Sequence, residues 1–225
     1  MTDHDARIRQ SWQTNAEAWT RAVREQRIES RRLVTDAAIL GAIADGPTRR
    51  VLDIGCGEGW LCRALAKWGS ECVGVDAATP LIEAARLAGG GRFEVMDYAA
   101  LIESGNSLGQ FDVLVCNFAL LDENLGSLLG ALRERLEPGG RLLIQTVHPW
   151  IAGGDEPYAD GWRLETFAAF GGAFRAPMPW FFRSLESWLA VLTASGWGLR
   201  QLREPRHPDT GKPCSLLLEL QPLAG

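Results

Sequence analysis

The N-terminal region carries apolar side chains at the spacing of a helix. Apolar positions that recur every three or four residues indicate an amphipathic helix. The residues of this stripe are Ile8, Trp12, Trp19 and Val23. A second apolar stretch covers residues 33–44, and the loop residues Asp45-Gly46-Pro47 end it. Residues 1–48 are therefore predicted to be a helical segment.

From Arg49 onward, short apolar runs alternate with helical patterns. The runs that are typical of buried strands cover residues 51–54, 72–75, 93–96, 111–116 and 142–147. Helices are predicted at residues 61–68, after Thr79 as a cap with Pro80 at the first position, and at residues 125–136. Strands that alternate with helices predict a parallel sheet covered by helices on both faces.

The C-terminal part departs from this alternation. A helix is predicted at residues 185–194, followed by strands at 197–202 and 216–220. The nine residues 205–213 are rich in Pro, Gly and Asp, and a parallel connection needs about a dozen residues or more. The last two strands are therefore predicted to form an antiparallel hairpin, which makes an α/β fold with a seven-stranded, mostly parallel sheet.

An aromatic insert lies between the fifth strand and the last helix. Residues 148–182 hold nine of the nineteen aromatic residues of the chain. Such a segment after a strand is either a wall or lid of a pocket or a small separate core packed on the sheet. We predict one domain with four segments, which are residues 1–48, 49–147, 148–182 and 183–225.

Composition narrows the class of protein. The 225 residues are 46% hydrophobic and 23% charged, which are ordinary values for one globular domain. No apolar run reaches about 18 residues, so no transmembrane helix is expected. The polar N-terminal region shows no secretory signal. The expected location is cytoplasmic.

Charge and cysteine content argue against several partners. The formal net charge is −5, whereas a protein that grips nucleic acid needs a dense basic face. A modest arginine cluster is interleaved with glutamates and is read as an exposed helix face with ion pairs. It consists of Arg21, Arg24, Arg27, Arg31 and Arg32. Neither nucleic acid nor a membrane is expected as a partner. The five cysteines and three histidines show no metal-ligand spacing, so reduced thiols and no metal are expected.

The residues after the first strand carry the strongest pattern. Asp53-Ile54-Gly55-Cys56-Gly57-Glu58-Gly59 joins that strand to a helix, and glycines there let a ligand approach the backbone. The spacing is GxGxG, whereas the dinucleotide fingerprint is GxGxxG, and Trp60 occupies the sixth position. The carboxylate of Asp53 would repel a pyrophosphate and attract an ammonium group.

This turn resembles the first motif of class I S-adenosylmethionine-dependent methyltransferases, and further motifs follow in register over residues 49–147. Val73-Gly74-Val75-Asp76 resembles the second motif, Met96-Asp97-Tyr98 the third, and residues 111–117 the fourth strand. Leu136-Glu137-Pro138-Gly139-Gly140 resembles the turn that follows. The resemblance implies a Rossmann-like fold, methyl transfer and S-adenosylmethionine as the cofactor.

The resemblance also implies a set of cofactor-binding residues. Asp76 would bind the ribose hydroxyls, Asp97 would meet the adenine amino group, and Arg31 would pair with the carboxylate of the cofactor. The full set is Asp53, Gly55, Cys56, Gly57, Asp76, Ala77, Asp97, Tyr98, Asn117, Phe118 and Arg31. Structural readings stay open, because Asp76 and Asp97 could cap local turns, Asn117 could be a buried amide, and Arg31 could be solvated.

The acceptor side is less defined. His148 follows the fifth strand and is a candidate general base, although it could instead fix the turn before Pro149. Asp155, Glu156 and Tyr158 are weaker candidates. The N-terminal helices are expected to form a lid. The residues expected to bind substrate are Trp12, Trp19, Trp150, Tyr158 and Trp180.

The fourth strand ends in Asn117-Phe118-Ala119-Leu120 and lacks the NPP-aromatic signature of enzymes that methylate nucleobase amino groups. We therefore expect transfer to an O or N atom of a small organic metabolite. The alternatives are a nicotinamide-dependent oxidoreductase, an S-adenosylmethionine-binding protein without catalysis, and an RNA or protein methyltransferase. The last of these requires the N-terminal arginines to form a continuous basic face. The oligomeric state stays open.

Overall fold

A seven-stranded sheet forms the centre of the molecule, in the order β3-β2-β1-β4-β5-β9-β8. The computed structural model describes residues 3–103, 107–154 and 156–223. Strands β1 to β5 pair in parallel, and β9 runs antiparallel to both β5 and β8. Their bounds are β1 (Arg50–Ile54), β2 (Glu71–Asp76), β3 (Arg92–Val95), β4 (Phe111–Asn117), β5 (Leu136–Val147), β8 (Trp197–Arg203) and β9 (Ser215–Pro222). The predicted sheet and its C-terminal hairpin are confirmed.

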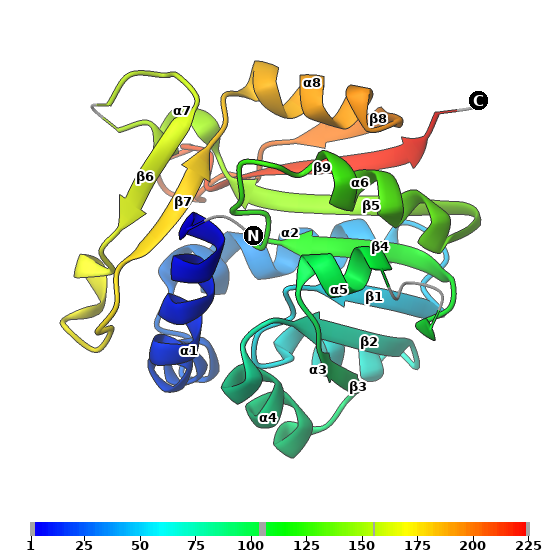
Figure 1. Ribbon diagram of the computed structural model, residues 1–225, viewed down its shortest axis with the longest axis horizontal. Helices are drawn as coiled ribbons and strands as arrows, with labels where there is room; N and C mark the ends of the chain where they lie inside the picture. Colours follow the sequence, from blue (N-terminus) through cyan, green and yellow to red (C-terminus); the bar gives the residue numbers. More distant parts are fainter. Residues whose placement is uncertain (1–2, 104–106, 155, 224–225) are drawn as a thin grey trace.

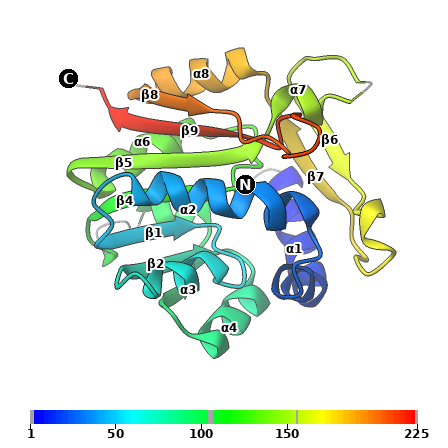
Figure 2. The ribbon, with the colours of Figure 1, turned by 180° about the vertical axis from the view of Figure 1, so that it is seen from behind.

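Helices cover both faces of the sheet, as the alternating pattern predicts. One face packs against α2 (Asp36–Ala44), α3 (Trp60–Ala66) and α4 (Thr79–Ala88), through a core that includes Ile39, Leu61 and Ile82. The other face packs against α5 (Tyr98–Glu103), α6 (Gly126–Leu132) and α8 (Leu185–Ala194). Figures 1 and 2 show the two layers from opposite sides. The apolar strands are consequently buried on both faces.

Two local predictions are wrong in detail. The helix predicted at residues 125–136 ends as α6 at Leu132, a 3₁₀ turn η3 (Arg133–Arg135) follows, and Leu136 already begins β5. The strand tolerates Pro138-Gly139-Gly140 because the register of β4 and β5 shifts between Phe111 and Val113. Thr79 is the first residue of α4, whose N-cap residue is Ala78 without a side-chain cap.

The N-terminal segment consists of α1 (Asp3–Arg24), a π-helical turn η1 (Arg31–Thr35) and α2. Whereas α2 lies on the sheet, α1 stands at its edge beside the two-stranded sheet of the insert (Figure 1). The buried Asn15 fixes α1 there. Its Nδ2 donates to the carbonyl oxygen of Ala176 at 2.7 Å, and its Oδ1 accepts from the backbone nitrogen of Arg175 at 2.8 Å.

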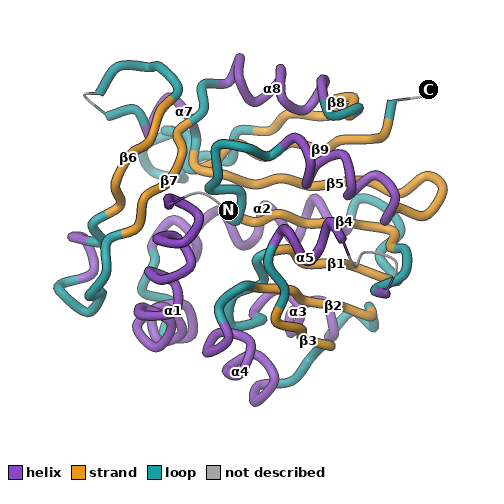
Figure 3. Tube along the Cα trace, viewed as in Figure 1, coloured by secondary structure: helices purple, strands orange, loops and turns teal. Residues whose placement is uncertain are grey.

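The aromatic insert forms a small sheet with its own core. It contains α7 (Pro149–Ala152), β6 (Gly161–Glu165), η4 (Ala168–Phe170) and β7 (Met178–Phe182), and β6 pairs antiparallel with β7. Figure 3 shows these strands standing apart from the main sheet. Ile8 and Trp12 of α1 pack with Phe167, Met178 and other insert residues in a separate apolar cluster. The small core that the sequence predicts on the main sheet is present, but it packs against α1, and the role of the insert as a pocket wall stays a prediction.

The described residues also bear on the expectations for membrane spans, metal sites and disulfides. No helix in the described ranges is long and apolar enough to cross a membrane. Those ranges also hold no group of three His, Cys, Asp or Glu residues that could bind a metal ion. All five cysteines are unpaired, and four of them are buried.

Candidate functional site

The glycine-rich turn after β1 has a conformation that needs glycine. Gly55, Gly57 and Gly59 have φ angles of 73°, 56° and 79°, a region that other residues rarely adopt. A Cβ on Gly59 would lie 2.7 Å from the ring of Phe93 in β3. Gly59 therefore allows the close approach of helix and strand for which a GxGxxG turn uses its third glycine. Trp60, at the sixth position, is the first residue of α3.

Asp76 at the end of β2 is tied to this turn. Its Oδ2 accepts from the backbone nitrogen of Gly57 at 2.9 Å, and its Oδ1 accepts from that of Ala78 at 2.8 Å. Burial raises the pKa of Asp76, and these two hydrogen bonds oppose the rise. Ala77, also predicted to bind the cofactor, follows Asp76 directly in the chain. The carboxylate of Asp76 therefore lies at the carboxyl edge of the sheet, which is where a residue that binds the ribose hydroxyls is expected. Its two hydrogen bonds also hold the backbone of the turn in place.

Asp53 in β1 is a buried carboxylate with no hydrogen-bond partner among the described residues. It is 2% exposed. Burial, with a smaller contribution from the charge of Asp76, raises the pKa of Asp53 to about 7, and Arg31 opposes the rise. An unpartnered carboxyl group in such a place is costly to ionise. It therefore suits a ligand that brings a positive charge.

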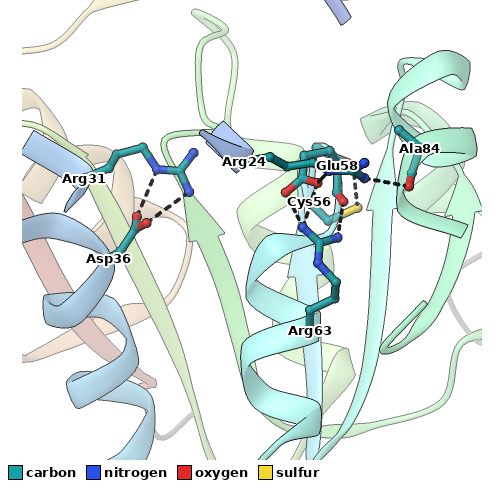
Figure 4. Close-up of polar contacts among 8 residues, drawn as sticks. Arg24, Arg31, Asp36, Cys56, Glu58, Arg63 and Ala84 are labelled. Atoms are coloured by element: carbon teal, nitrogen blue, oxygen red, sulfur yellow. Dashed lines mark hydrogen bonds and ion pairs between the residues drawn. The ribbon is translucent and has the colours of Figure 1, made fainter. Parts of the chain in front are cut away.

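Arg31 in η1 is held in a fixed position near Asp53. Its Nε donates to Oδ1 of Asp36 at 2.9 Å (Figure 4), and its guanidinium lies 4.7 Å from the ring centre of Trp60 and 5.8 Å from that of Trp19. The side chain is only 11% exposed, so the alternative of a solvated arginine is wrong. Arg31 and Asp53 place a positive and a negative group in one region of the site.

Helix α1 covers the turn. The Nε1 atom of Trp19 lies 3.5 Å from the point that a Cβ on Gly57 would occupy. Trp12 and Trp19 also pack with Ala16 of α1 and with Ala78 and Leu81 at the start of α4. The helix that was predicted to be a lid therefore lies directly on the residues predicted to bind the cofactor.

The residues after β3 show a structural role for Asp97. Its Oδ1 accepts from the backbone nitrogen of Ala100 at 2.9 Å, which caps α5, and its Oδ2 pairs with Arg9 of α1 at 3.2 Å. Tyr98 donates its hydroxyl proton to the carbonyl oxygen of Ala119 at 2.5 Å. Asp97 therefore caps α5, which is one of the two roles that the sequence predicts for it, and its contact with adenine stays a prediction.

The end of β4 is held from the neighbouring strand. Asn117 accepts from Nε2 of Gln145 at 2.8 Å, and the backbone nitrogen of Phe118 donates to the carbonyl oxygen of Gln145 at 2.7 Å. Phe118 has a φ of 55°, which is unusual for a bulky residue and is often found at functional sites. Asn117 is thus a paired amide, and its partner is a side chain.

His148 lies after β5 and is paired with a residue that the sequence did not reveal. Its Nε2 is 2.9 Å from Oε1 of Glu204, which follows β8, while its Nδ1 is buried without a hydrogen-bond partner among the described residues. The contact with His148 lowers the pKa of Glu204. A carboxylate on one ring nitrogen fixes the tautomer and leaves the other nitrogen as an acceptor.

The predicted substrate-binding aromatics fall into two groups. Trp12 and Trp180 pack in the apolar cluster of α1 and the insert, and Trp12 contacts Trp19 edge to face at 5.1 Å between ring centres. Trp150 and Tyr158 lie 6.0 Å apart on the outer part of the insert, and they are 72% and 45% exposed. The weaker candidate Glu156 pairs with Arg163, and Asp155 lies outside the described residues.

Two further groups at this edge were missed by sequence reasoning. Glu58 inside the turn is fully buried and paired with Arg24 and Arg63, and its place between two glycines of the turn was the available sign. Asp122 after β4 has a pKa raised to about 6 by burial and by the neighbouring carboxylate of Asp5. No local pattern marks Asp122, because its neighbours come from distant parts of the chain.

Comparisons with known proteins agree with this geometry. Residues 23–202 match a family model described as a methyltransferase domain. A ubiquinone biosynthesis O-methyltransferase of Brucella anthropi is 34% identical over 106 residues, which are 44% of this chain and 41% of that protein. The match thus spans less than half the length of this curated relative.

Two solved structures share the fold. A complex of DhpI with SAH has a TM-score of 0.65 at 18% identity, and the alignment covers 98% of this chain and 99% of that one. The glycopeptide N-methyltransferase MtfA, in complex with S-adenosylmethionine, has a TM-score of 0.65 at 18% identity and covers 84% and 87% of the two chains.

The residues at the edge of the sheet fit S-adenosylmethionine. The unpartnered carboxyl group of Asp53 and the nearby Arg31 suit a ligand with an ammonium and a carboxylate group. Gly55 and Gly57 bring no side chain to the turn, and Asp76 offers acceptors for hydroxyl groups. On the family match and this architecture, the chain belongs to the methyltransferase domain family, within the class I S-adenosylmethionine-dependent superfamily.

Proposed function

We propose that this protein transfers the methyl group of S-adenosylmethionine to an O or N atom of a small organic acceptor. The observation that carries the proposal is the cover at the carboxyl edge of the sheet. There α1 and the aromatic insert share one apolar cluster, and Trp19 of α1 lies against the glycine turn. Such a cover would suit a small acceptor held beside the cofactor and away from water.

The bound cofactor supplies an electrophilic methyl group on a positively charged sulfur. The residues of this chain would align the reactants and exclude water, which are the main contributions of an enzyme to such a displacement. Asp76 would hold the ribose hydroxyls, Asp53 and Arg31 the charged end of the cofactor, and Trp19 would exclude water from the turn.

The pairing of arginines on the N-terminal segment supports a small acceptor. Arg21 pairs with Glu17, Arg24 with Glu58, Arg27 with Glu25, and Arg31 with Asp36. Four of the five clustered arginines are thus matched by carboxylates. An RNA-binding enzyme would need a continuous basic face.

We propose His148 as the general base for an acceptor that must lose a proton. The contact with Glu204 would keep the proton on Nε2, so that Nδ1 accepts the proton of the acceptor. Because Nδ1 is buried, this role requires that the residues around His148 admit the acceptor.

A thermal-shift titration with S-adenosylmethionine, S-adenosylhomocysteine and NAD tests the cofactor. A ligand at one hundred times its dissociation constant stabilises by about 2.7 kcal/mol, which is a rise of roughly 5–10 °C for a chain of this size. A rise with NAD alone would refute the proposal in favour of an oxidoreductase.

An acceptor screen then tests catalysis. Candidate phenols, hydroxy acids and amines are incubated with the protein and S-adenosylmethionine, and mass spectrometry detects a gained methyl group together with S-adenosylhomocysteine. Tight cofactor binding without turnover on any acceptor would favour the non-catalytic alternative. Methylation of an RNA or protein substrate alone would contradict the small acceptor.

A further inference from the structure

A fully buried carboxylate lies inside the glycine turn. Glu58 is 0% exposed. Arg63 of α3 donates from Nη2 to both carboxylate oxygens, at 2.6 and 2.7 Å, and from Nη1 to the carbonyl oxygen of Glu58 at 2.6 Å. Because α3 begins directly after the turn, Arg63 stays with Glu58 whatever the position of α1. The buried negative charge therefore has a permanent counter-charge.

A second arginine reaches the same carboxylate from α1. Arg24 is the last residue of α1, and its Nε donates to Oε2 of Glu58 at 2.7 Å (Figure 4). Its Nη2 donates to the carbonyl oxygen of Ala84 in α4 at 3.0 Å. One guanidinium thus joins α1, the glycine turn and α4. This bridge uses the fork of donors that arginine has and lysine lacks.

The two arginines differ in what their release would cost. Removal of Arg63 would leave a buried charge without its main partner, which is strongly destabilising. Release of Arg24 leaves Glu58 paired with Arg63, and the side chain of Arg24 is already 43% exposed. The contact of Arg24 can therefore break and form again while the turn keeps its shape.

From this arrangement we infer that Arg24 is a positioning residue, which fastens α1 over the turn when the cofactor is bound and releases α1 when the cofactor enters or leaves. The contact lies on the same helix as Trp19, which covers Gly57. A closed α1 would retain the cofactor through contacts that an open α1 loses. The inference rests on the proposed binding of S-adenosylmethionine and does not depend on the acceptor.

Calorimetric titration with S-adenosylhomocysteine tests this role. Arg24→Ala removes a charged hydrogen bond, so we expect about tenfold weaker binding. Arg24→Lys keeps the charge without the bridge and should bind with intermediate affinity. The matched control is Arg21→Ala, on the same helix, since Arg21 pairs with the exposed Glu17. It should bind within about twofold of the wild type.

Hydrogen exchange of α1 gives a second readout that a purely structural role would not move. In the wild type, S-adenosylhomocysteine should slow exchange of the α1 amides, and Arg24→Ala should lose most of this protection while its secondary structure is unchanged. Wild-type affinity and protection in Arg24→Ala, or equal losses in Arg21→Ala, would overturn the inference. If the wild type itself binds no S-adenosylhomocysteine, the cofactor proposal fails and this inference fails with it.

Discussion

Asp53 offers a direct test of how the site recognises its cofactor. Burial raises the pKa of Asp53 to about 7 in the absence of a ligand. A ligand ammonium group next to this carboxyl group favours its charged form. Binding should therefore release a proton near neutral pH, and affinity should rise with pH.

The size of the effect follows from the fraction of Asp53 that is ionised before binding. With a pKa of about 7, this fraction rises from about one tenth near pH 6 to about nine tenths near pH 8. The affinity for S-adenosylhomocysteine should rise about tenfold over this range, or about 1.4 kcal/mol. Asp53→Asn should bind more weakly than the wild type at both pH values, by the widest margin near pH 8, and its affinity should not rise with pH.

Titration calorimetry in two buffers of different ionisation enthalpy measures both the affinity and the released proton. Asp122→Asn is a suitable control, since it removes another carboxyl group, partly buried and with a pKa of about 6, and should keep the rise above neutral pH. A flat affinity between these pH values in the wild type, with no proton release, would refute the role of Asp53.

The raised pKa of Asp53 also makes the stability of the ligand-free protein depend on pH. The pKa of Asp53 in the folded protein lies above the ordinary value of an aspartate, so the folded protein binds more protons than the unfolded chain between that value and about 7. The contribution of Asp53 to the free energy of unfolding is fully present below the unfolded pKa, and it is lost as pH rises toward about 7. Asp53→Asn should remove this loss, and thermal melts across this range would show it.

Three further outcomes are expected. Asp76→Ala should weaken cofactor binding at least about tenfold, because charge-assisted bonds to two hydroxyl groups are lost; unchanged affinity by calorimetry would exclude the ribose role. His148→Ala should leave S-adenosylhomocysteine affinity intact and lower the rate on an acceptor that loses a proton, with Glu204→Gln lowering it in the same direction; a loss of cofactor binding would instead assign His148 to the cofactor site or to folding. Gly59→Ala should lower the melting temperature by roughly 5–10 °C, since its Cβ would lie 2.7 Å from Phe93 at a φ of 79°; a melting temperature equal to that of the wild type would show that α3 can shift at little cost.

Local pattern was sufficient for the core of the fold. The apolar runs at residues 51–54 and 72–75 became β1 and β2 within one residue at each end, because a strand buried on both faces must be apolar throughout. The short polar link after β8 excluded a crossover helix and so predicted the antiparallel hairpin. The two strands of the insert were not predicted, because they are short and the aromatic residues of the insert show neither helical nor alternating spacing.

The sequence by itself therefore determined the sheet, the glycine turn and the acidic residues at the strand ends, because these depend on neighbours within a few positions. Only the tertiary structure decided which distant groups meet. Arg24 and Glu58 are 34 residues apart, and His148 and Glu204 are 56 apart. Nothing local distinguishes Arg24 from the other arginines of its cluster, since any of them could pair with a carboxylate. The packing of α1 at the edge of the sheet brings Arg24 to the buried Glu58, which Arg63 reaches from α3.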